Sequence, residues 1–518
     1  MTPKTILYTT LGILVLGITG LTLSNTTTWQ LPQTQGNKTI DLKEGDTYTL
    51  TASYVTKRIG GKEQKMLAYN GSIPGPTLKI PQGAEITIDF KNATDLPAAL
   101  HAHGVRMDNQ YDGAPPLTQQ EVAPGKSFTY KLKFPDVGAF WYHPHVHEVY
   151  EQPLGLYGAF IVMPTDLKYY PPVNREVPLF LSDIPMGNGS ITLTANDDDH
   201  ILMGHYGNIF LTNGQENFSL SANAGEVIRF YIVNAANARP FNIAIPGTQI
   251  KVIGSDSGAY EKAFFAENVT LGPSERAIID VLFEKAGAYE LQNKTPNKTY
   301  VLGAITTSTN TATTSYVIPF GTLQKNDAVE KSIAPFRQYL DKTPDKRLQF
   351  TIDMNGNMLS MPGMGHTGHM MPDGTRMGGS MTSQSEDGIE WDDTNSMMNQ
   401  MSTTNSVQWK IVDQDTKKEN MDIDWTLKKD TPVKIRIYND SNSMHPMQHP
   451  IHFHGQRFLV VARDGVKQTN LVWKDTTLVK SGETVDIILD PSNPGTWMAH
   501  CHTAEHLQSG MMFTYKVE

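Results

Sequence analysis

One strand–turn–strand pattern recurs three times in this chain and limits what the chain can fold into. Its first part alternates apolar and polar residues and ends in asparagine, at residues 83–92, 225–234 and 430–439. Its second part is a β-rich run followed by a glycine and an aromatic residue, at residues 124–141, 272–289 and 481–497. Period-two alternation bounded by Gly, Pro and Asn predicts strands, and strong helical periodicity is scarce. The pattern therefore predicts an all-β chain of three consecutive Greek-key β-sandwich domains.

The repeats place the three domains at residues 29–165, 166–332 and 333–518. A chain of 518 residues is long enough for each domain to bury its own core. Residues 354–405 interrupt the third domain, and residues 354–401 contain 11 of the 23 methionines among many Gly, Ser, Asp and Asn residues. Because this Met-rich segment lacks the apolar bulk for a core, we expect a mobile surface insertion.

Residues 1–28 are predicted to be an export signal or an N-terminal membrane anchor. Lys4 precedes an uncharged stretch from Ile6 to Leu23, and polar residues follow it, as in export signals. About 20 apolar residues can also span a bilayer, so cleavage and anchoring both stay open. An internal helix is the alternative. The net charge of −10 and the pI near 5.9 argue against nucleic acid as a partner.

The single cysteine, Cys501, lies between two histidines in the run His500-Cys-His-Thr-Ala-Glu-His506, with Met511 five residues further on. A thiolate, two imidazoles and a weak thioether are the ligands of a blue-copper centre. Neighbouring side chains of a strand point to opposite faces, so Cys501 would face one metal and the flanking histidines another. This arrangement predicts a short electron path between two metal sites. A buried structural cysteine beside unrelated histidines is the alternative.

Three further histidine clusters accompany this run. In an H-x-H pair on a strand, both imidazoles share one face and can hold one metal or bridge two. The clusters are His101 with His103, His143 with His145, and His449 with His452 and His454. The second repeat has Gln292 and Lys294 where the first and third have histidine, so the second domain is expected to lack ligands.

The four clusters, in this order, resemble the signature of the three-domain multicopper oxidases, which include laccases and bacterial cuprous oxidases. The resemblance covers residues 40–518 and implies cupredoxin-like domains that hold four copper ions, one type 1, one type 2 and a binuclear type 3 pair. The implied ligands are His449, Cys501, His506 and Met511 for type 1, His101 and His452 for type 2, His103, His143 and His502 for one type 3 ion, and His145, His454 and His500 for the other.

The family's activity implies four one-electron oxidations of a small reductant, coupled to reduction of O2 to two waters between domains one and three. Asp112 matches an acidic position that the family places near the type 2 copper, where a proton donor is needed. Many bacterial members have Glu directly after the last histidine, whereas this chain has Leu507, so Glu505 is a candidate replacement. Ala102 stands where the family usually has Trp.

The reductant has two interpretations. Thioethers favour Cu(I), and the Met-rich segment resembles that of periplasmic cuprous oxidases. The candidate substrate-copper ligands are Met354, Met358, Met444 and Met447. His445 occupies the position where the family has an acid near Met447. The alternative is a laccase-like oxidase of phenols or aromatic amines, and a third hypothesis is a non-catalytic copper-sequestering protein. We expect an exported monomer in the periplasm or at the outer cell surface.

Overall fold

The computed structural model describes residues 31–355, 369–370, 376–377 and 387–518. Within these residues strands dominate and helices are few and short, which confirms the predicted all-β class. The predicted export signal or anchor lies outside the described residues, as does Met358. No helix in the described part of the chain is both long and apolar enough to cross a membrane.

The first domain is a sandwich of a five-stranded and a four-stranded sheet that share one hydrophobic core. The five-stranded sheet has the order β1 (Thr39–Asp41), β4 (Thr77–Pro81), β9 (Gly158–Met163), β8 (Gly138–His143) and β6 (His101–His103). The four-stranded sheet has the order β3 (Lys62–Tyr69), β2 (Thr47–Ile59), β5 (Glu85–Ala93) and β7 (Ser127–Lys133).

The second domain packs a six-stranded sheet on a five-stranded one. The first has the order β13 (Ile209–Thr212), β10 (Arg175–Ile184), β15 (Glu226–Asn234), β20 (Arg276–Phe283), β17 (Ile250–Ser255) and β18 (Gly258–Ala266). The second has the order β14 (Phe218–Ala224), β22 (Thr299–Thr311), β21 (Gly287–Lys294), β16 (Phe241–Ala244) and β19 (Asn268–Leu271). A small hairpin joins β11 (Met186–Gly187) to β12 (Ser190–Ile191).

The third domain has a seven-stranded and a five-stranded sheet. The first contains β26 (Val407–Asp413), β23 (Lys346–Met354), β28 (Val433–Asn439), β34 (Thr484–Asp490), β30 (Arg457–Arg463), β31 (Val466–Lys467) and β32 (Trp473–Lys474). The second has the order β27 (Asp424–Leu427), β36 (Met512–Val517), β35 (Gly495–Cys501), β29 (His449–Phe453) and β33 (Thr476–Val479). Within the Met-rich segment, β24 (His369–Met370) pairs with β25 (Arg376–Met377).

The three sequence repeats occupy equivalent places in the three sandwiches. The first two strands of each repeat form an antiparallel pair, β5 with β7, β15 with β20, and β28 with β34. The strand that follows the repeat's glycine lies in the opposite sheet in every domain, as β8, β21 and β35. Alternating apolar side chains of both sheets fill the space between them, because one face of each strand must be buried.

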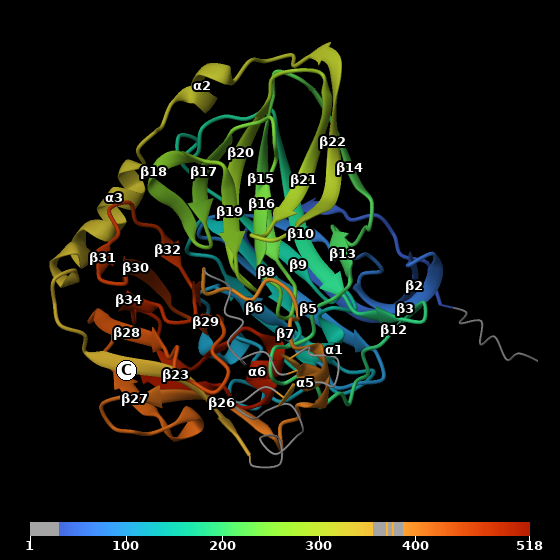
Figure 1. Cartoon of the computed structure of the whole chain (residues 1–518). Coiled ribbons are helices and arrows are strands. Elements are labelled where there is room, and N and C mark those ends of the chain that lie inside the picture. The colour runs from blue at the N-terminus through green and yellow to red at the C-terminus, as the bar shows by residue number, and fades with distance from the viewer. Residues whose placement is uncertain (1–30, 356–368, 371–375, 378–386) are drawn as a thin grey trace, which may run out of the picture.

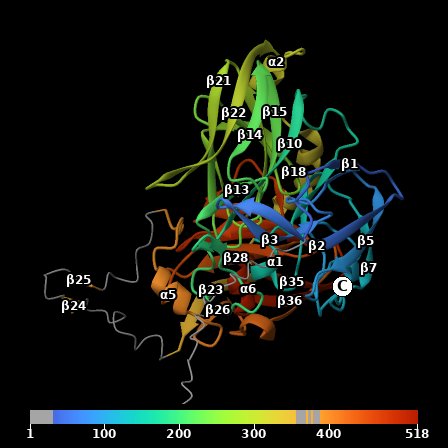
Figure 2. The ribbon, with the colours of Figure 1, turned by 90° about the vertical axis from the view of Figure 1, so that its right-hand side faces the viewer.

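The helices lie between and beside the sandwiches. They are α1 (Glu148–Glu151), α2 (Val317–Gly321), α3 (Asp327–Ile333), α5 (Ser396–Met401) and α6 (Ala504–Gln508), with 3-10 turns η1 (Asn109–Tyr111), η2 (Ala334–Tyr339) and η3 (Asn420–Asp422). The second domain stands above the other two in both views (Figures 1 and 2). Below it the first and third domains meet, and Asn109 donates across this contact to the Thr496 carbonyl at 2.7 Å.

The Met-rich segment differs in one part from the expected surface insertion. Trp391 and Ile389 are buried against Leu478, and Asn399 of α5 is fully buried. The Asn399 side chain accepts a hydrogen bond from the Met203 amide at 2.9 Å and donates to the Gly204 carbonyl at 2.9 Å. The prediction of a segment without a core is therefore wrong for residues 387–401, which pack against Leu478 of the third domain and against a loop of the second domain.

Candidate metal centres

Four strands from two domains bring the predicted histidines together. In the first domain β6 pairs with β8, with His101 opposite His143. In the third domain β29 pairs with β35, with His452 opposite His500. The alternation of side chains along β35 directs Cys501 to one side and His500 to the other. The pairs of strands face each other across the interface between domains one and three.

A glycine follows two of the four H-x-H pairs, and both glycines are required by close approach. Gly104 has a φ of +81°, and a Cβ there would lie 2.2 Å from a carboxylate oxygen of Asp475. Gly455 has a φ of +63°, and its Cβ would lie 2.3 Å from the Trp497 ring. A side chain at either position would push the histidine-bearing strand away from the centre.

Cys501, His449 and His506 form the first centre. The Cys501 Sγ lies 3.6 Å from the Nδ1 of each histidine, and the two Nδ1 atoms are 3.1 Å apart. The centre of this triangle is about 2 Å from all three atoms, which is the bond length from a transition metal to an imidazole nitrogen. The Thr503 amide donates to the sulfur at 3.4 Å, and the Met511 carbonyl accepts from the Cys501 amide at 3.1 Å.

A cover of apolar groups closes this centre from solvent. The Trp409 ring lies 4.6 Å from the His449 ring and 4.4 Å from the His506 ring, measured between centroids. Its indole N–H donates to the Ile201 carbonyl at 2.9 Å, which ties β26 to a loop of the second domain. His449 and His506 are at most 1% exposed, and Leu202 is fully buried in the same cluster. A bulky molecule therefore has no direct contact with either imidazole.

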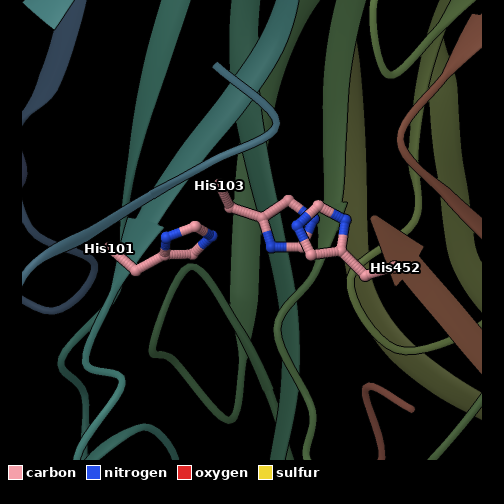
Figure 3. A group of neighbouring side chains, drawn as sticks. All are labelled: His101, His103 and His452. Atoms are coloured by element: carbon pink, nitrogen blue, oxygen red, sulfur yellow. The ribbon is translucent and has the colours of Figure 1, made fainter. Parts of the chain in front are cut away.

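Eight histidines form the second centre, about one residue away along β35. Their ring nitrogens lie in overlapping groups, His101 with His103 and His452, His103 with His143 and His502, and His145 with His454 and His500. Figure 3 shows the His103 and His452 rings stacked, with the His101 ring directed toward them; the stacked centroids are 3.7 Å apart. In the second domain Lys294 is exposed at the position equivalent to His145 and His502.

In several of these rings one nitrogen is hydrogen-bonded to a backbone carbonyl, and the other nitrogen has no hydrogen-bond partner. His101 donates through Nδ1 to the Asp112 carbonyl at 2.6 Å, and His452 donates to the Asp475 carbonyl at 2.8 Å. His143 and His500 likewise donate to backbone carbonyls, of Pro144 and Cys501. Other ring nitrogens are buried without a partner, namely Nε2 of His101, His143, His145, His452 and His502 and Nδ1 of His103.

The Nε2 atoms of His454 and His500 face each other. His454 donates its Nδ1–H to Asp112 Oδ2 at 2.8 Å, and His500 donates its Nδ1–H to a carbonyl, so each neutral ring keeps a lone pair on Nε2. These two Nε2 atoms are 2.9 Å apart. Two lone pairs at this separation need a cation between them. The arrangement is that of metal ligands with their second nitrogen fixed by the protein.

Burial keeps the imidazoles in the form that binds metals. It lowers the pKa of His145 to about 4 and of His449 to about 3, and it holds the pKa of His101, His103, His143, His454, His500, His502 and His506 well below the usual range. Burial also raises the pKa of the Cys501 thiol to about 12. A metal must therefore displace the thiol proton, and binding releases it.

Asp475 is a buried carboxylate that the sequence did not reveal as part of this centre. Its Oδ1 lies 3.1 Å from His103 Nε2, and Arg276 of the second domain grips both of its oxygens. Burial opposes the ionisation of Asp475, but the Arg276 guanidinium outweighs it and holds the pKa of this carboxyl well below its usual range. These residues are far apart in sequence, so only the assembled domains bring them together.

Glu148 is a second residue that sequence reasoning missed. Its Oε1 lies 3.3 Å from His143 Nδ1 and 3.8 Å from His502 Nε2. Burial and, to a lesser degree, the negative charge of Glu505 raise the pKa of Glu148 to about 8. Its place three residues after His145, at the start of α1, was the available signal.

The other predicted site residues take varied positions. Asp112 contacts both His101 and His454, as described above. Glu505 Oε1 instead accepts hydrogen bonds from the His205 amide and ring, at 3.0 and 2.8 Å. Met447 and Met354 are buried in the same cluster as Cys501, Met511 and Trp409, whereas Met444 is 36% exposed. Ala102, fully packed in β6, leaves the histidines on either side of it in place.

The comparisons with known proteins agree with this geometry. Three family models, each described as multicopper oxidase, match residues 51–166, 182–318 and 390–518, together most of the chain. "Multicopper oxidase mco" of Staphylococcus aureus is 26% identical over 482 residues, which are 91% of this chain and 88% of the relative. "Laccase-12" of Arabidopsis thaliana is 24% identical over 519 residues, with 88% and 89% covered.

A solved structure described as "Multicopper oxidase from Campylobacter jejuni: a metallo-oxidase" has the same fold. Its TM-score is 0.67 at 23% identity, and the match covers 94% of this chain and 96% of that chain.

Proposed function

Because the chain belongs to the multicopper oxidase family, we propose that its reductant is Cu(I), in copper tolerance, and that it is an oxidase of these ions. The overall reaction is 4 Cu⁺ + O2 + 4 H⁺ → 4 Cu²⁺ + 2 H2O. Copper is the family's cofactor, and the donor set fits it, because a thiolate and imidazoles meet where buried ring nitrogens lack partners, and Met511 is buried in the same cluster.

The proposed cofactors are four copper ions. The type 1 ion would be held by His449, Cys501 and His506 with Met511 as the weak axial ligand, the type 2 ion by His101 and His452, and the type 3 ions by His103, His143 and His502 and by His145, His454 and His500. When bound, these ions supply the one-electron steps and the four-electron reduction of O2. The grouping of the ring nitrogens supports this assignment.

The chain's own groups orient and connect the two centres. The backbone and side chain of Cys501 lie between His500 and His502, so electrons need to cross only a few covalent bonds. The Thr503 amide stabilises the sulfur as a thiolate, and hydrogen bonding at this atom tunes the potential of such a centre. The Asp112 carbonyl and carboxylate fix the rings of His101 and His454 from outside.

The observation that favours Cu(I) over a phenol is the closed cover of the Cys501 centre. Trp409 packs on both of its histidines, and the centre is at most 1% exposed. A metal ion is small enough to reach such a centre through side chains that bind it in turn. Met447 is fully buried two residues before His449, and Met354 is buried at the end of β23. Both thioethers suit Cu(I).

His445 lies among the side chains by which we propose that Cu(I) reaches the Cys501 centre. It is buried with its Nε2 unpartnered, and its charge would act on both His449 and His506. Burial lowers the pKa of His445 to about 4, so its ring is neutral and able to bind a metal. We include His445 with Met354, Met358, Met444 and Met447 among the proposed ligands of the substrate ion.

A laccase-like activity on phenols or aromatic amines is the second candidate, since several relatives are plant laccases. A phenol or aromatic amine would reach the Cys501 centre only if the cover around Trp409 opened. Sequestration of copper without turnover would not need the eight-histidine centre and is disfavoured.

The protons for O2 reduction are proposed to pass by Asp112 and Glu505. Asp112 contacts two histidines of the second centre directly. Glu505 is fully buried in α6, and its Oε2 has no hydrogen-bond partner. Glu148, which contacts His143 and His502, adds a third carboxyl to this path.

The place of action is proposed to be the periplasm or the outer cell surface. The apolar run of residues 6–23 after Lys4 supports export.

Replacement of Met447 by Leu tests the substrate. The two side chains have similar volume, so the fold should tolerate the change. We expect kcat/KM for Cu(I) to fall by about tenfold or more, as when a metal ligand's support is lost. The kcat/KM for a simple phenol should change less than about twofold, and Met66→Leu, in the buried core of the first domain, is the matched control.

A second variant lacks residues 354–401. It should lose Cu(I) oxidation and keep or gain phenol oxidation, because the deletion removes Asn399, which holds the loop that covers the Cys501 centre. Equal losses for both reductants in Met447→Leu, or unchanged Cu(I) oxidation in the deletion, would contradict the proposal.

A further inference from the structure

A third cluster of side chains of the kinds that bind metals lies outside the Cys501 centre and the eight-histidine centre. It is formed by Asp199, His200 and His205, on the loop that connects β12 to β13. The Asp199 Oδ1 lies 2.9 Å from His200 Nδ1 and 3.3 Å from His205 Nε2. The two imidazole rings are 4.1 Å apart between centroids, tilted by 33°. Ligand atoms bonded to one tetrahedral ion at about 2.0–2.1 Å are separated by about the same distances.

Glu505 supports His205 as the outer partner of a metal ligand would. The His205 Nδ1–H and its backbone amide both donate to Glu505 Oε1, at 2.8 and 3.0 Å. This fixes the ring and leaves Nε2 directed at Asp199 and His200. A metal-bound histidine almost always donates its other ring N–H to a carboxylate or carbonyl in this way.

The loop itself is held in place. His200 has a φ of +56°, a left-handed conformation that non-glycine residues rarely adopt, and it brings the His200 ring against His205. The Leu202 and Met203 amides donate to the Ser402 and Asn399 side chains at 2.8 and 2.9 Å. The three side chains are thus positioned by contacts beyond the loop, while Asp199 and His200 keep part of their surface in solvent.

We propose that Asp199, His200 and His205 form a further metal site that takes Cu(II), the oxidised product of the proposed reaction. The proposal rests on the proposed function. The site lies beside the Cys501 centre, because Ile201 and Leu202, between its ligands, cover Trp409 and His506. Ions would reach the centre through thioethers, which prefer Cu(I), and leave it at imidazole and carboxylate groups, which suit Cu(II).

The same three groups can instead share a proton. Burial opposes a charge on His205, but the hydrogen bonds that His205 donates to the Asp199 and Glu505 carboxylates outweigh it and raise the pKa of His205 to about 10. The groups that face this ring are Asp199 and His200 from its own loop and Glu505 from α6. Copper must therefore displace a proton from His205, and binding should release it.

The test measures Cu(II) binding by the full-length protein with its four coppers loaded. Equilibrium dialysis counts the bound ions, and electron paramagnetic resonance reports their ligands. Asp199→Asn and His200→Ala remove ligands but keep the His205–Glu505 contact. Asp198→Asn is the matched control, because it removes the same charge from the same loop, where Asp198 accepts a hydrogen bond from the Thr404 amide.

We expect the wild type and Asp198→Asn to bind one more equivalent of Cu(II) than Asp199→Asn and His200→Ala, or to bind it at least about tenfold more tightly. Its spectrum should show nitrogen ligands, and the blue absorption of all four proteins should be the same. Equal Cu(II) binding by all four proteins would overturn the proposal and leave the proposed Cu(I) oxidation intact. If the extra equivalent is present but the protein prefers phenols to Cu(I), the assignment of this site to the product is wrong.

Discussion

Arg276 is the residue through which the second domain, although it carries none of the eight histidines, reaches the eight-histidine centre. Its side chain is fully buried, and its guanidinium donates hydrogen bonds to both carboxylate oxygens of Asp475. It also donates to the Ala139 carbonyl of the first domain at 2.8 Å and to the Ser274 carbonyl at 2.9 Å. All three domains are therefore joined at one side chain, and Asp475 in turn orients His103 and His452.

Replacement of Arg276 by Met would keep most of the volume and leave Asp475 as an unpaired buried charge. The loss of one partner from a buried ion pair costs about 3–5 kcal/mol. Arg436→Met is the matched control, because Arg436 makes a two-bond pair with Asp486 but is 45% exposed, and such pairs contribute about 0–1 kcal/mol.

Urea unfolding of the copper-free proteins, followed by tryptophan fluorescence, measures both changes. The midpoint should fall several times further in Arg276→Met than in Arg436→Met. After copper loading, Arg276→Met should also bind copper less tightly at the eight-histidine centre, by about 10–100-fold, while the blue absorption is kept. Equal shifts of the two midpoints, with full copper occupancy in both variants, would refute this reasoning.

Three further predictions concern single residues. Cys501→Ser should abolish the intense blue absorption of the copper-loaded protein, and survival of the colour would show that Cys501 is not a copper ligand. Gly455→Ala should lower the unfolding midpoint and the copper content, because its Cβ would meet the Trp497 ring at 2.3 Å; wild-type values for both would show that the strand can shift freely. His205 gains its partners on folding and its pKa rises to about 10, so the stability difference between wild type and His205→Gln should be full below about pH 6.5 and vanish as the pH rises through about 10. Urea midpoints measured between these pH values check this, and a difference that grows with pH would contradict it.

The fold and the histidine clusters were accessible from sequence for the same physical reason. A strand's side chains alternate between two faces, so an H-x-H pair and the His500–Cys501–His502 run carry their own geometry. The repeats then indicated which strands are equivalent in the three domains. Nothing about these inferences depended on how the domains pack together.

The groups that surround the ligands did depend on that packing. Arg276 meets Asp475 across 199 positions of sequence, and His205 meets Glu505 across 300. A buried charge or a cover such as Trp409 has no local pattern that marks it. The packing of residues 387–401 was missed for the same reason, since Asn399 bonds to Met203 and Gly204, which are 196 and 195 positions away in the sequence.

The most direct test of the account is the consumption of oxygen by the copper-loaded protein with Cu(I) or a simple phenol as the reductant. We predict faster uptake with Cu(I), with four Cu(I) ions oxidised for each O2 consumed and no hydrogen peroxide released. Faster uptake with the phenol, or two Cu(I) ions oxidised for each O2 with peroxide formed, would contradict it.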